Sequence, residues 1–245
     1  MEQGEIIQLG NHRLMCGDCT KPEDVRKLLE GVRIDSLVTD PPYGVDYATK
    51  NKLFNELYGN ERNVKQIEHD SISDYYNFYY CFLDNVKPYM NDYNTCYIFI
   101  HGKELHNLRL AFEDAGYYWS DYLAWVKNNH VLNRKDYSAM MEHILYGWCG
   151  KHKFYGGFRI NVLNYKRTYK NDLHPTMKPI DLLEQLVTDG CDRGGNVLDC
   201  FGVSGSTLIA CENTGRNCFM MECDGDYCDV IRDRYFDVCA QEKLV

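Results

Sequence analysis

The sequence predicts an α/β fold built on a doubly wound sheet, and three observations support this prediction. Apolar runs of strand length alternate with segments whose apolar residues recur at helical spacing. The chain has 245 residues, enough for one large domain, and contains neither repeats nor a low-complexity linker. The polar residues with the clearest chemistry follow predicted strands, where doubly wound proteins bind ligands. We therefore expect a single domain spanning residues 1–245.

The expected elements follow one another in the order strand, loop, helix. Strands are expected at residues 32–39, 95–100, 122–126, 143–148, 196–200 and 218–221. Helices are expected at residues 75–86, 103–115, 180–188, 205–213 and 227–238. Two prolines stop the first strand, and Gly116 ends the second helix. Residues 45–72 are polar and show no period, so we expect a long loop there.

Composition and charge limit the class of protein. No apolar run approaches the length of a membrane span and no secretory signal is evident, so we expect a cytoplasmic protein with no membrane partner. The formal net charge of −9 argues by itself against a nucleic-acid partner. The charge is uneven, however. Residues 127–170 carry nine basic and two acidic residues, a balance of +7, whereas residues 171–245 carry six and fourteen, a balance of −8. One face could therefore meet a polyanion.

The twelve cysteines do not indicate a disulfide framework, because a chain of this length can bury a core without covalent links. Most are expected to be reduced and buried in apolar surroundings, as at Cys81, Cys96, Cys211 and Cys218. Cys16 and Cys19 have the spacing of metal ligands. A zinc site needs a second such pair or histidine partners. None is evident, so we expect no metal.

A strand, a turn of small residues and a helix follow one another between Leu198 and Thr207. Such a turn lets a ligand approach the backbone closely. About twenty residues later, Glu222 ends the next predicted strand, where a carboxylate can accept both ribose hydroxyls of an adenosine. The glycine spacing is not that of a dinucleotide site, and no Gly-Lys-Ser/Thr follows as in a P-loop. An ordinary strand–turn–helix with an exposed acid explains the pattern equally well.

The segment from His174 to Pro179 is a second candidate for ligand binding. Thr176 and Lys178 place a hydroxyl and an ammonium two residues apart between prolines, and together they could bind a small carboxylate. The alternative is a loop that starts a helix, since Pro179 fits a first-turn position.

The tetrapeptide Asp40-Pro41-Pro42-Tyr43 follows a predicted buried strand. Two prolines fix φ and remove two backbone donors, so the local carbonyls are left as acceptors. A carboxylate and a carbonyl could take the two hydrogens of an NH₂ group while the flat ligand stacks on Tyr43. The alternative is a polar turn at a strand end.

Together these segments resemble the β class of amino-group DNA methyltransferases, bacterial and phage enzymes of restriction–modification or orphan type. The matching segments lie in the family order and cover most of the chain. They are Asp40–Tyr43, His174–Pro179, Asp199–Thr207, and Glu222 with Asp224 and Tyr227. Weaker matches are Trp125–Lys127 and Glu142–Leu145. The family loop usually reads Asp-Pro-Phe-x-Gly-Ser-Gly-Thr-Thr. Here Cys200 replaces the proline, Val203 a glycine and Ser206 a threonine.

The resemblance implies a Rossmann-like sheet that binds S-adenosyl-L-methionine (SAM), with a circularly permuted motif order in which the catalytic tetrapeptide precedes the cofactor loop. It implies that Asp40, Pro41, Pro42 and Tyr43 are catalytic. It also implies a set of cofactor-binding residues: Asp18, His174, Thr176, Lys178, Asp199, Phe201, Gly202, Ser204, Gly205, Ser206, Thr207 and Glu222. Asp18, in the segment Cys16–Cys19, is expected to contact the adenine.

By the same resemblance, the enzyme transfers a methyl group in line to the exocyclic amino nitrogen of a base flipped out of double-stranded DNA. Residues 128–172 lie where the β class has its target-recognition region, a short basic insertion. The expected DNA-binding residues are Lys151, Lys153, Arg159, Lys166, Arg167 and Lys170. The alternative is a solvated basic loop. Because the region is short, one chain would recognise a short site or two chains would share the recognition as a homodimer.

Adenine N6 is the preferred target because aspartate in the first position of the tetrapeptide is more typical of adenine enzymes, and serine of cytosine-N4 enzymes. A SAM enzyme acting on RNA or protein amide nitrogen is an alternative, although Asn-Pro-Pro-Tyr is usual there. An inactive SAM- or DNA-binding regulator is opposed by the intact tetrapeptide. A nicotinamide enzyme is opposed by the glycine spacing.

Overall fold

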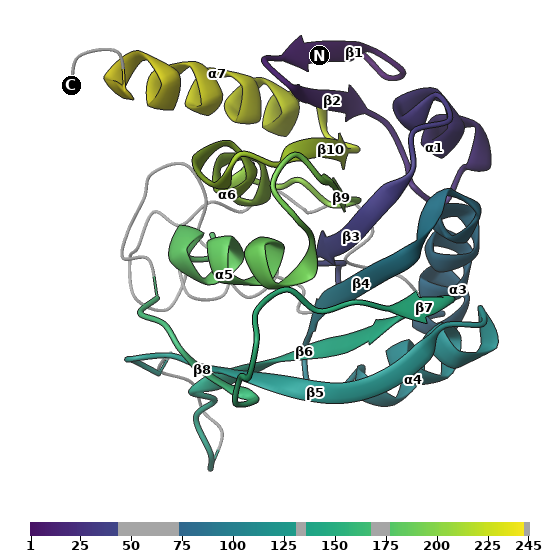
Figure 1. Ribbon diagram of the computed structural model, residues 1–245, viewed down its shortest axis with the longest axis vertical. Coiled ribbons are helices and arrows are strands. Elements are labelled where there is room, and N and C mark those ends of the chain that lie inside the picture. Colours follow the sequence, from purple (N-terminus) through teal and green to yellow (C-terminus); the bar gives the residue numbers. More distant parts are fainter. Residues whose placement is uncertain (44–73, 131–135, 168–176, 243–245) are drawn as a thin grey trace, which may run out of the picture.

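The computed structural model describes residues 1–43, 74–130, 136–167 and 177–242. Within these ranges the chain forms one mixed sheet with helices on both faces (Figure 1). The expected loop at 45–72 lies outside the described residues. So do three of the expected site residues, Lys170, His174 and Thr176. No helix in the described ranges is long and apolar enough to cross a membrane.

The elements of the described chain alternate between strand and helix over most of its length. The strands are β1 (Ile6–Leu9), β2 (His12–Cys16), β3 (Ile34–Thr39), β4 (Met90–Ile100), β5 (Tyr118–Val126), β6 (Met141–Trp148), β7 (Lys151–His152), β8 (Val162–Asn164), β9 (Asn196–Asp199) and β10 (Asn217–Glu222). The helices are α1 (Pro22–Leu29), α3 (Tyr75–Val86), the short 3₁₀ helix η1 (Lys87–Tyr89), α4 (Leu105–Asp114), α5 (Ile180–Gly190), α6 (Ser206–Thr214) and α7 (Gly225–Glu242).

The sheet has a parallel centre and an antiparallel flank. Its strand order is β1-β2-β10-β9-β3-β4-β6-β5-β8, and β7 pairs with the start of β4. The five central strands, β2, β10, β9, β3 and β4, are parallel. β6 runs antiparallel to β4, and β5 antiparallel to β6. The predicted doubly wound centre is therefore present, but it is extended by an antiparallel hairpin that alternation of strands and helices does not predict.

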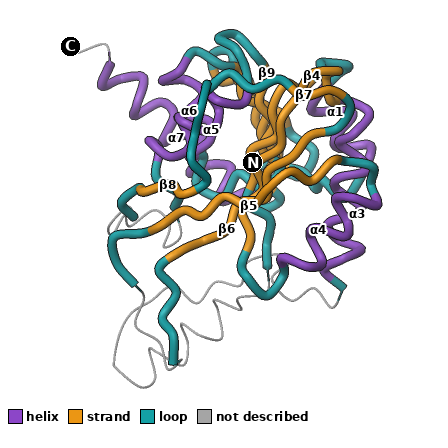
Figure 2. The backbone as a smooth tube through the Cα atoms, turned by 60° about the horizontal axis from the view of Figure 1, so that its bottom comes forward, coloured by secondary structure: helices purple, strands orange, loops and turns teal. Residues whose placement is uncertain are grey.

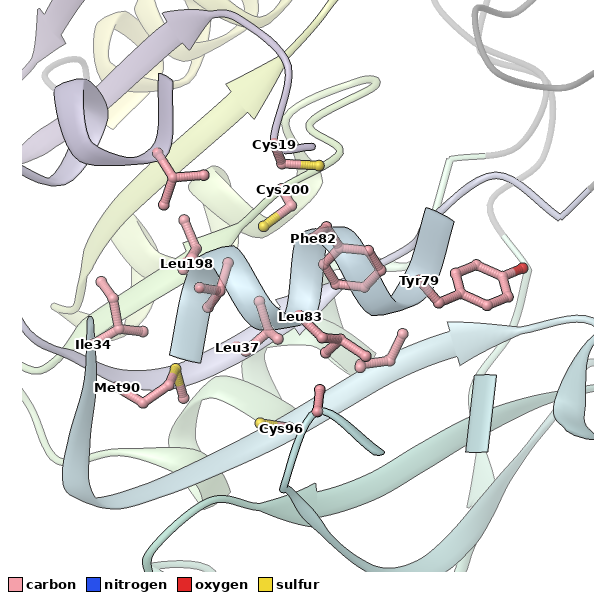
Figure 3. Packing of buried hydrophobic residues seen from close by; sticks show 14 of the residues in the cluster. Cys19, Ile34, Leu37, Tyr79, Phe82, Leu83, Met90, Cys96, Leu198 and Cys200 are labelled. Carbon is pink, nitrogen blue, oxygen red and sulfur yellow. The ribbon is translucent and has the colours of Figure 1, made fainter. Parts of the chain in front are cut away.

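Two apolar clusters fill the two faces of the sheet. Helices α1, α3 and α4 cover one face, and α5, α6 and α7 cover the other (Figures 1 and 2). The first cluster is drawn in Figure 3, where side chains of α3 such as Phe82 and Leu83 pack over the sheet residues Leu37 and Cys96. The core helices have the expected apolar spacing. α4 buries Leu108, Ala111 and Phe112.

The structure contains elements that were not predicted. These are the hairpin β1–β2, helix α1 and the short strands β7 and β8. For α1, Pro22 at the first turn and the acids behind it are ordinary helix-start signals. Several strands are longer than predicted. β4 begins at Met90 instead of residue 95, because its polar first residues still pair with β7.

The strand directions define two edges of the sheet. We call the edge formed by the carboxyl ends of β2, β10, β9, β3 and β4 the carboxyl edge, and the opposite one the amino edge. The antiparallel flank also reaches the carboxyl edge: His143 of β6 pairs with Ile100, and Val126 of β5 pairs with Met141. Residues at the start of β6 and the end of β5 therefore lie at the edge where the parallel strands end.

Candidate active site

Three of the predicted carboxylates follow neighbouring strands at the carboxyl edge. Glu222 ends β10, Asp199 ends β9 and Asp40 directly follows β3. Asp18 lies two residues past β2, and the neighbouring Gly17 N–H donates to the Glu222 carbonyl at 2.9 Å. Because β2, β10, β9 and β3 are adjacent in the sheet, the fold brings these four residues to one side of the molecule.

The loop after β9 is held by three hydrogen bonds, two to β10 and one from α7. The Gly202 N–H donates to the Met221 carbonyl at 2.8 Å, and a Cβ added at Gly202 would lie 2.9 Å from the Met220 side chain. The Val203 N–H donates to Glu222 Oε2 at 2.8 Å. From α7, the buried Arg234 guanidinium donates to the Ser204 carbonyl at 2.6 Å. The loop therefore has a defined shape before any ligand binds.

Asp199 is buried, with 4% of its surface exposed. Its Oδ1 accepts hydrogen bonds from Thr39 Oγ1 at 2.7 Å and from the Phe201 N–H at 3.1 Å. Burial raises the pKa of Asp199 to about 7, against the opposing effect of hydrogen bonds from Thr207, Thr39 and Phe201. This carboxyl group therefore changes charge near neutral pH.

A pocket connects the loop to the tetrapeptide. Its lining comes from the ends of β3 and β9, the loop after β9, the start of α6, and the segment leading into α5. The lining residues are Thr39, Asp40, Phe99, Lys178, Leu183, Asp199, Phe201, Gly202, Val203, Ser204, Ser206 and Thr207. Nine of these twelve lie in the tetrapeptide, the predicted loop or the segment around Lys178, so the fold brings together motifs far apart in sequence.

Asp40 carries two carboxylate oxygens with different surroundings. Oδ2 accepts a hydrogen bond from Lys178 Nζ. Oδ1 is buried and has no hydrogen-bond partner in the part of the chain that the structure describes. Burial raises the pKa of Asp40 above its ordinary value, and the Lys178 ammonium opposes this effect. A buried acceptor without a partner costs free energy unless a ligand supplies the missing donor.

The rest of the tetrapeptide is held by aromatic residues. The Tyr79 hydroxyl of α3 donates to the Pro42 carbonyl at 3.2 Å. The ring of Tyr43 stacks on His101, just past β4, with 6.0 Å between centroids. Neither partner belongs to a motif, so sequence reasoning did not identify Tyr79 or His101.

Lys178 contacts two carboxylates of the chain itself. The sequence indicated that it could bind a small carboxylate together with Thr176, and its assignment to the cofactor site stays a prediction. In the structure its Nζ contacts the carboxylates of Asp40 and, at 3.5 Å, Glu142. Glu142 in turn pairs with Lys127. Lys127 and Glu142 each belong to a weakly matching family segment, and this was the one signal in the sequence that could have identified them.

The cysteines differ in part from expectation. Cys96, Cys211 and Cys218 are buried as predicted, but Cys81 is exposed because it lies on the outer face of α3. Cys16 packs in the cluster under α5–α7, whereas Cys19 packs in the opposite cluster beside Cys200 (Figure 3). The two thiols therefore do not face a common ion. The described ranges contain no group of three or more metal-ligating side chains.

The predicted DNA-binding residues separate into two groups along the sheet. Lys166 and Arg167 lie two and three residues past β8, whose Asn164 pairs with Val126, so they lie toward the carboxyl edge. Lys151 pairs in register with Tyr93, near the start of β4. Ile100 lies seven positions further along β4 than Tyr93, which corresponds to about 23 Å at the usual strand rise.

The other two described residues of this set have partners at or near the amino edge. Lys153 Nζ lies 4.5 Å from the centre of the Tyr155 ring. Arg159 pairs with the buried Asp189 at 2.9 Å.

The fold resembles that of solved DNA methyltransferases. M1.HpyAVI, solved as a complex with SAM, matches with a TM-score of 0.67 and 21% identity, covering 90% of this chain and 98% of that one. PvuII DNA methyltransferase, a cytosine-N4-specific enzyme, matches with a TM-score of 0.68 and 14% identity, covering 94% and 92%. The mixed α/β fold of the described chain is thus the fold of these solved structures.

The sequence comparisons specify the family. The DNA methylase family model for N6 and N4 enzymes matches residues 34–233, so the chain belongs to the N6/N4 amino-group DNA methyltransferases. The type II methyltransferase M.HpaI of Haemophilus parainfluenzae is 24% identical over 253 residues, covering 91% of this chain and 74% of that protein. M2.MboI of Moraxella bovis is 21% identical, covering 93% and 89%. SAM is the cofactor of this family, and the predicted family and cofactor are confirmed.

Proposed function

We propose that this enzyme methylates N6 of adenine in double-stranded DNA. The observation that carries the proposal is the buried Asp40 Oδ1, an acceptor without a partner in the described residues, which lies in the pocket shared with the loop after β9. An exocyclic amino group supplies the donor that this oxygen lacks. Both N6 of adenine and N4 of cytosine fit that description, and aspartate at this position favours adenine by family tendency.

The residues of the carboxyl edge fit a SAM molecule. Glu222 is a buried acceptor at the end of β10, where a ribose would lie in this class of sheet. Asp18, beside it, is assigned to the adenine. Asp199 and the loop from Phe201 to Thr207 border the space that leads to Asp40. SAM supplies an electrophilic methyl group there. His174 and Thr176, outside the described residues, remain expected contributors.

In the proposed mechanism Asp40 Oδ1 and the Pro41 carbonyl accept the two hydrogens of the amino group, and the base stacks on Tyr43. The amino lone pair is delocalised into the ring, and these two acceptors favour its localisation on nitrogen. They also stabilise the positive charge that develops there, because they are already oriented. Tyr79 holds the Pro42 carbonyl and so limits movement of the tetrapeptide. No covalent intermediate is required.

A base in a duplex cannot reach a buried carboxylate, so the target base must be flipped out. Residues 128–172 are proposed as the target-recognition region. Within it Lys166 and Arg167 are favoured for phosphate contacts, because they follow β8 toward the carboxyl edge. The tetrapeptide at residue 40 precedes the loop at residue 199, which supports the permuted order of the β class. Two chains could share recognition of one site.

The test is methyl transfer from labelled SAM to unmethylated duplex DNA, followed by digestion to nucleosides and mass spectrometry. N6-methyladenine is the expected product, and sequencing of DNA from an unmethylated host would give the site. The Asp40→Ala variant should still bind SAM but transfer nothing. N4-methylcytosine as the product would overturn the assignment of the base. Label in RNA or protein but not in DNA would overturn the substrate.

A further inference from the structure

A row of four side chains with alternating charge runs from β5 to the tetrapeptide. Its members are Lys127, which directly follows β5, Glu142 of β6, Lys178 before α5, and Asp40 after β3. Lys127 Nζ donates to Glu142 Oε1, Glu142 Oε2 lies 3.5 Å from Lys178 Nζ, and Lys178 Nζ donates to Asp40 Oδ2. The four side chains are between 8% and 22% exposed.

Glu142 occupies the centre of this row. Burial would raise its pKa, but the ammonium groups of Lys178 and Lys127 outweigh burial, and the pKa of Glu142 lies below its ordinary value. Each lysine also lies close to an aromatic ring: Lys178 Nζ is 5.1 Å from the centre of Phe99, and Lys127 Nζ is 4.8 Å from that of Trp125. Glu142 is therefore an anion that fixes two partly desolvated cations in place.

This arrangement makes the Asp40 carboxylate asymmetric. Lys178 Nζ contacts Oδ2 and also lies 3.5 Å from Glu142 Oε2, whereas Oδ1 has no hydrogen-bond partner in the described part of the chain. Lysine carries three rotatable donors on a flexible stem, so nothing in Lys178 itself restricts it to one oxygen. A second anion beside its Nζ supplies that restriction.

We propose that Glu142 is a positioning residue, which holds the Lys178 ammonium on Asp40 Oδ2 and thereby keeps Oδ1 open for the amino group of the target base. Lys127 fixes Glu142 from the other side. This inference rests on the proposed role of Asp40 and does not depend on whether the base is adenine or cytosine.

Lys178 and Glu142 affect the ionisation of Asp40 in opposite directions. Lys178 favours the ionised carboxylate, and Glu142 disfavours it. Lys127 acts like Lys178, more weakly. Asp199 and the Tyr79 hydroxyl also interact electrostatically with Asp40, and both are left unchanged in the test. Removing the charge of Glu142 should therefore lower the pKa of Asp40 while freeing Lys178 to cover both of its oxygens.

The first measurement is the single-turnover rate of methyl transfer against pH, with enzyme and SAM in excess over duplex DNA. We call the low-pH part of this profile, where the rate rises as Asp40 ionises, the acid limb, and the pH-independent maximal rate the plateau. Lys178→Met should move the acid limb to higher pH, because the cation that favours the carboxylate is gone. Glu142→Gln should move the limb to lower pH and still reduce the plateau by about tenfold to hundredfold, the effect of a misplaced reacting group. A residue that only supports the fold would not move the limb. A residue that acts only by charge would leave the plateau unchanged.

The second measurement does not require activity. In protein labelled with ¹³C at aspartate carboxyls, the Asp40 signal is identified by its loss in Asp40→Asn and then titrated. Its pKa should fall in Glu142→Gln and rise in Lys178→Met. If these shifts occur but the unaltered enzyme methylates no DNA, the proposed function fails while the placement of Glu142 stands. If the signal does not shift, or if an active enzyme keeps its plateau in Glu142→Gln, the positioning role is wrong.

Glu113→Gln is the matched control, because Glu113 is an exposed carboxylate paired with Arg109 at 3.1 Å on α4. It should change neither the plateau nor the limb. Glu142→Asp keeps the charge and should recover part of the lost rate while leaving the acid limb near that of the unaltered enzyme. If Glu142→Gln does not fold, Glu142→Asp and Lys178→Met are compared instead. The proposal would be overturned if both variants kept the plateau rate and the acid limb of the unaltered enzyme.

Discussion

Val203 is a residue whose backbone conformation does not suit its side chain. Its φ is +46°, in the left-handed region, and Glu30 is the other non-glycine residue with positive φ in the described chain. A β-branched residue rarely adopts this conformation. The family loop has glycine at this position, and the substitution was visible in the sequence. Its conformational consequence was not, because a motif alignment says nothing about φ.

Val203→Gly is expected to stabilise the protein slightly. The left-handed conformation costs an L-residue roughly 1–2 kcal/mol, and glycine costs roughly 0.5–1 kcal/mol through its freedom in the unfolded chain. The net gain should be at most about 1.5 kcal/mol, which corresponds to a Tm higher by at most about 3–6 °C. Thermal melting of the apo-protein measures it.

The matched control is Val162→Gly. Val162 lies on β8 without a positive φ and is 40% exposed, so this change should lower Tm. Equal losses of Tm in both variants would mean that Val203 is not strained.

The Asp199 carboxyl is expected to make stability depend on pH. Its pKa is about 7 in the folded protein, above its ordinary value of 3.8, so the folded state binds the proton more tightly than the unfolded one. The resulting stabilisation is complete below about pH 4 and is lost as pH rises to about 7. Asp199→Asn stays neutral throughout, so its stability relative to the unaltered protein should increase by roughly 2–4 kcal/mol over that window.

Urea unfolding of both proteins at pH 5 and pH 7.5 measures this difference. The amide oxygen introduced by Asp199→Asn can still accept the hydrogen bonds from Thr39 and Phe201, so the contrast isolates the charge. A free-energy difference between the two proteins that is the same at both pH values would contradict the raised pKa.

At the scale of elements, the parallel centre of the sheet was predictable and the flank was not. Strands such as β3 and β9 are apolar, buried on both faces and followed by turn residues, which are strong local signals. The direction of β5 and β6 depends on pairing between distant segments, and local patterns carry no information about it. The sequence therefore predicted that the tetrapeptide and the loop after β9 lie at the same edge of the sheet, and they do. The flank brings Lys127 and Glu142 to the same edge, and the sequence did not indicate that they lie near Asp40.

The segment between β7 and β8 is part of the basic stretch 151–170, which the sequence predicts to contact DNA. The sequence did not indicate where this segment packs. In the structure it packs against α5, where the Arg159 guanidinium donates three hydrogen bonds to the buried Asp189 carboxylate. Nε donates to Oδ2 at 3.1 Å and to Oδ1 at 3.3 Å, and Nη2 donates to Oδ1 at 2.9 Å. Segment and sheet enclose a cavity of about 340 Å³ lined by residues such as Tyr97, Tyr146 and Leu186.

Arg159→Ala is expected to destabilise the fold, since it leaves a buried carboxylate without its charged partner. The loss should be about 1–3 kcal/mol, or a Tm lower by roughly 2–12 °C. Lys153→Ala, an exposed lysine of the same segment, is the control and should leave Tm unchanged. Weaker DNA binding in Arg159→Ala with an unchanged Tm would instead assign Arg159 to the DNA interface.

At the scale of the whole molecule, the question is how a chain of net charge −9 binds a polyanion. The predicted basic residues lie toward two different edges of the sheet. Lys166 and Arg167 lie toward the carboxyl edge, with Asp40, whereas Lys151 and Lys153 follow β6 and β7 near the amino edge, about 23 Å away along β4. If the flipped base lies at Asp40, as proposed, we expect the duplex to meet the first pair. Composition could predict the charge of the segment but not which end of it faces the site.

Two charge reversals of equal size test this placement. In Lys166→Glu/Arg167→Glu, DNA affinity should fall by about tenfold or more at low salt. The slope of log K against log salt should also become shallower by roughly two, because two phosphate contacts are lost. In Lys151→Glu/Lys153→Glu the net charge changes by the same amount, so any effect of overall charge is shared, yet the slope should stay close to that of the unaltered enzyme. Fluorescence anisotropy with a labelled duplex at several salt concentrations measures both. Equal losses in the two variants would mean that the whole segment binds DNA, and the duplex would then have to extend past the carboxyl edge toward β7.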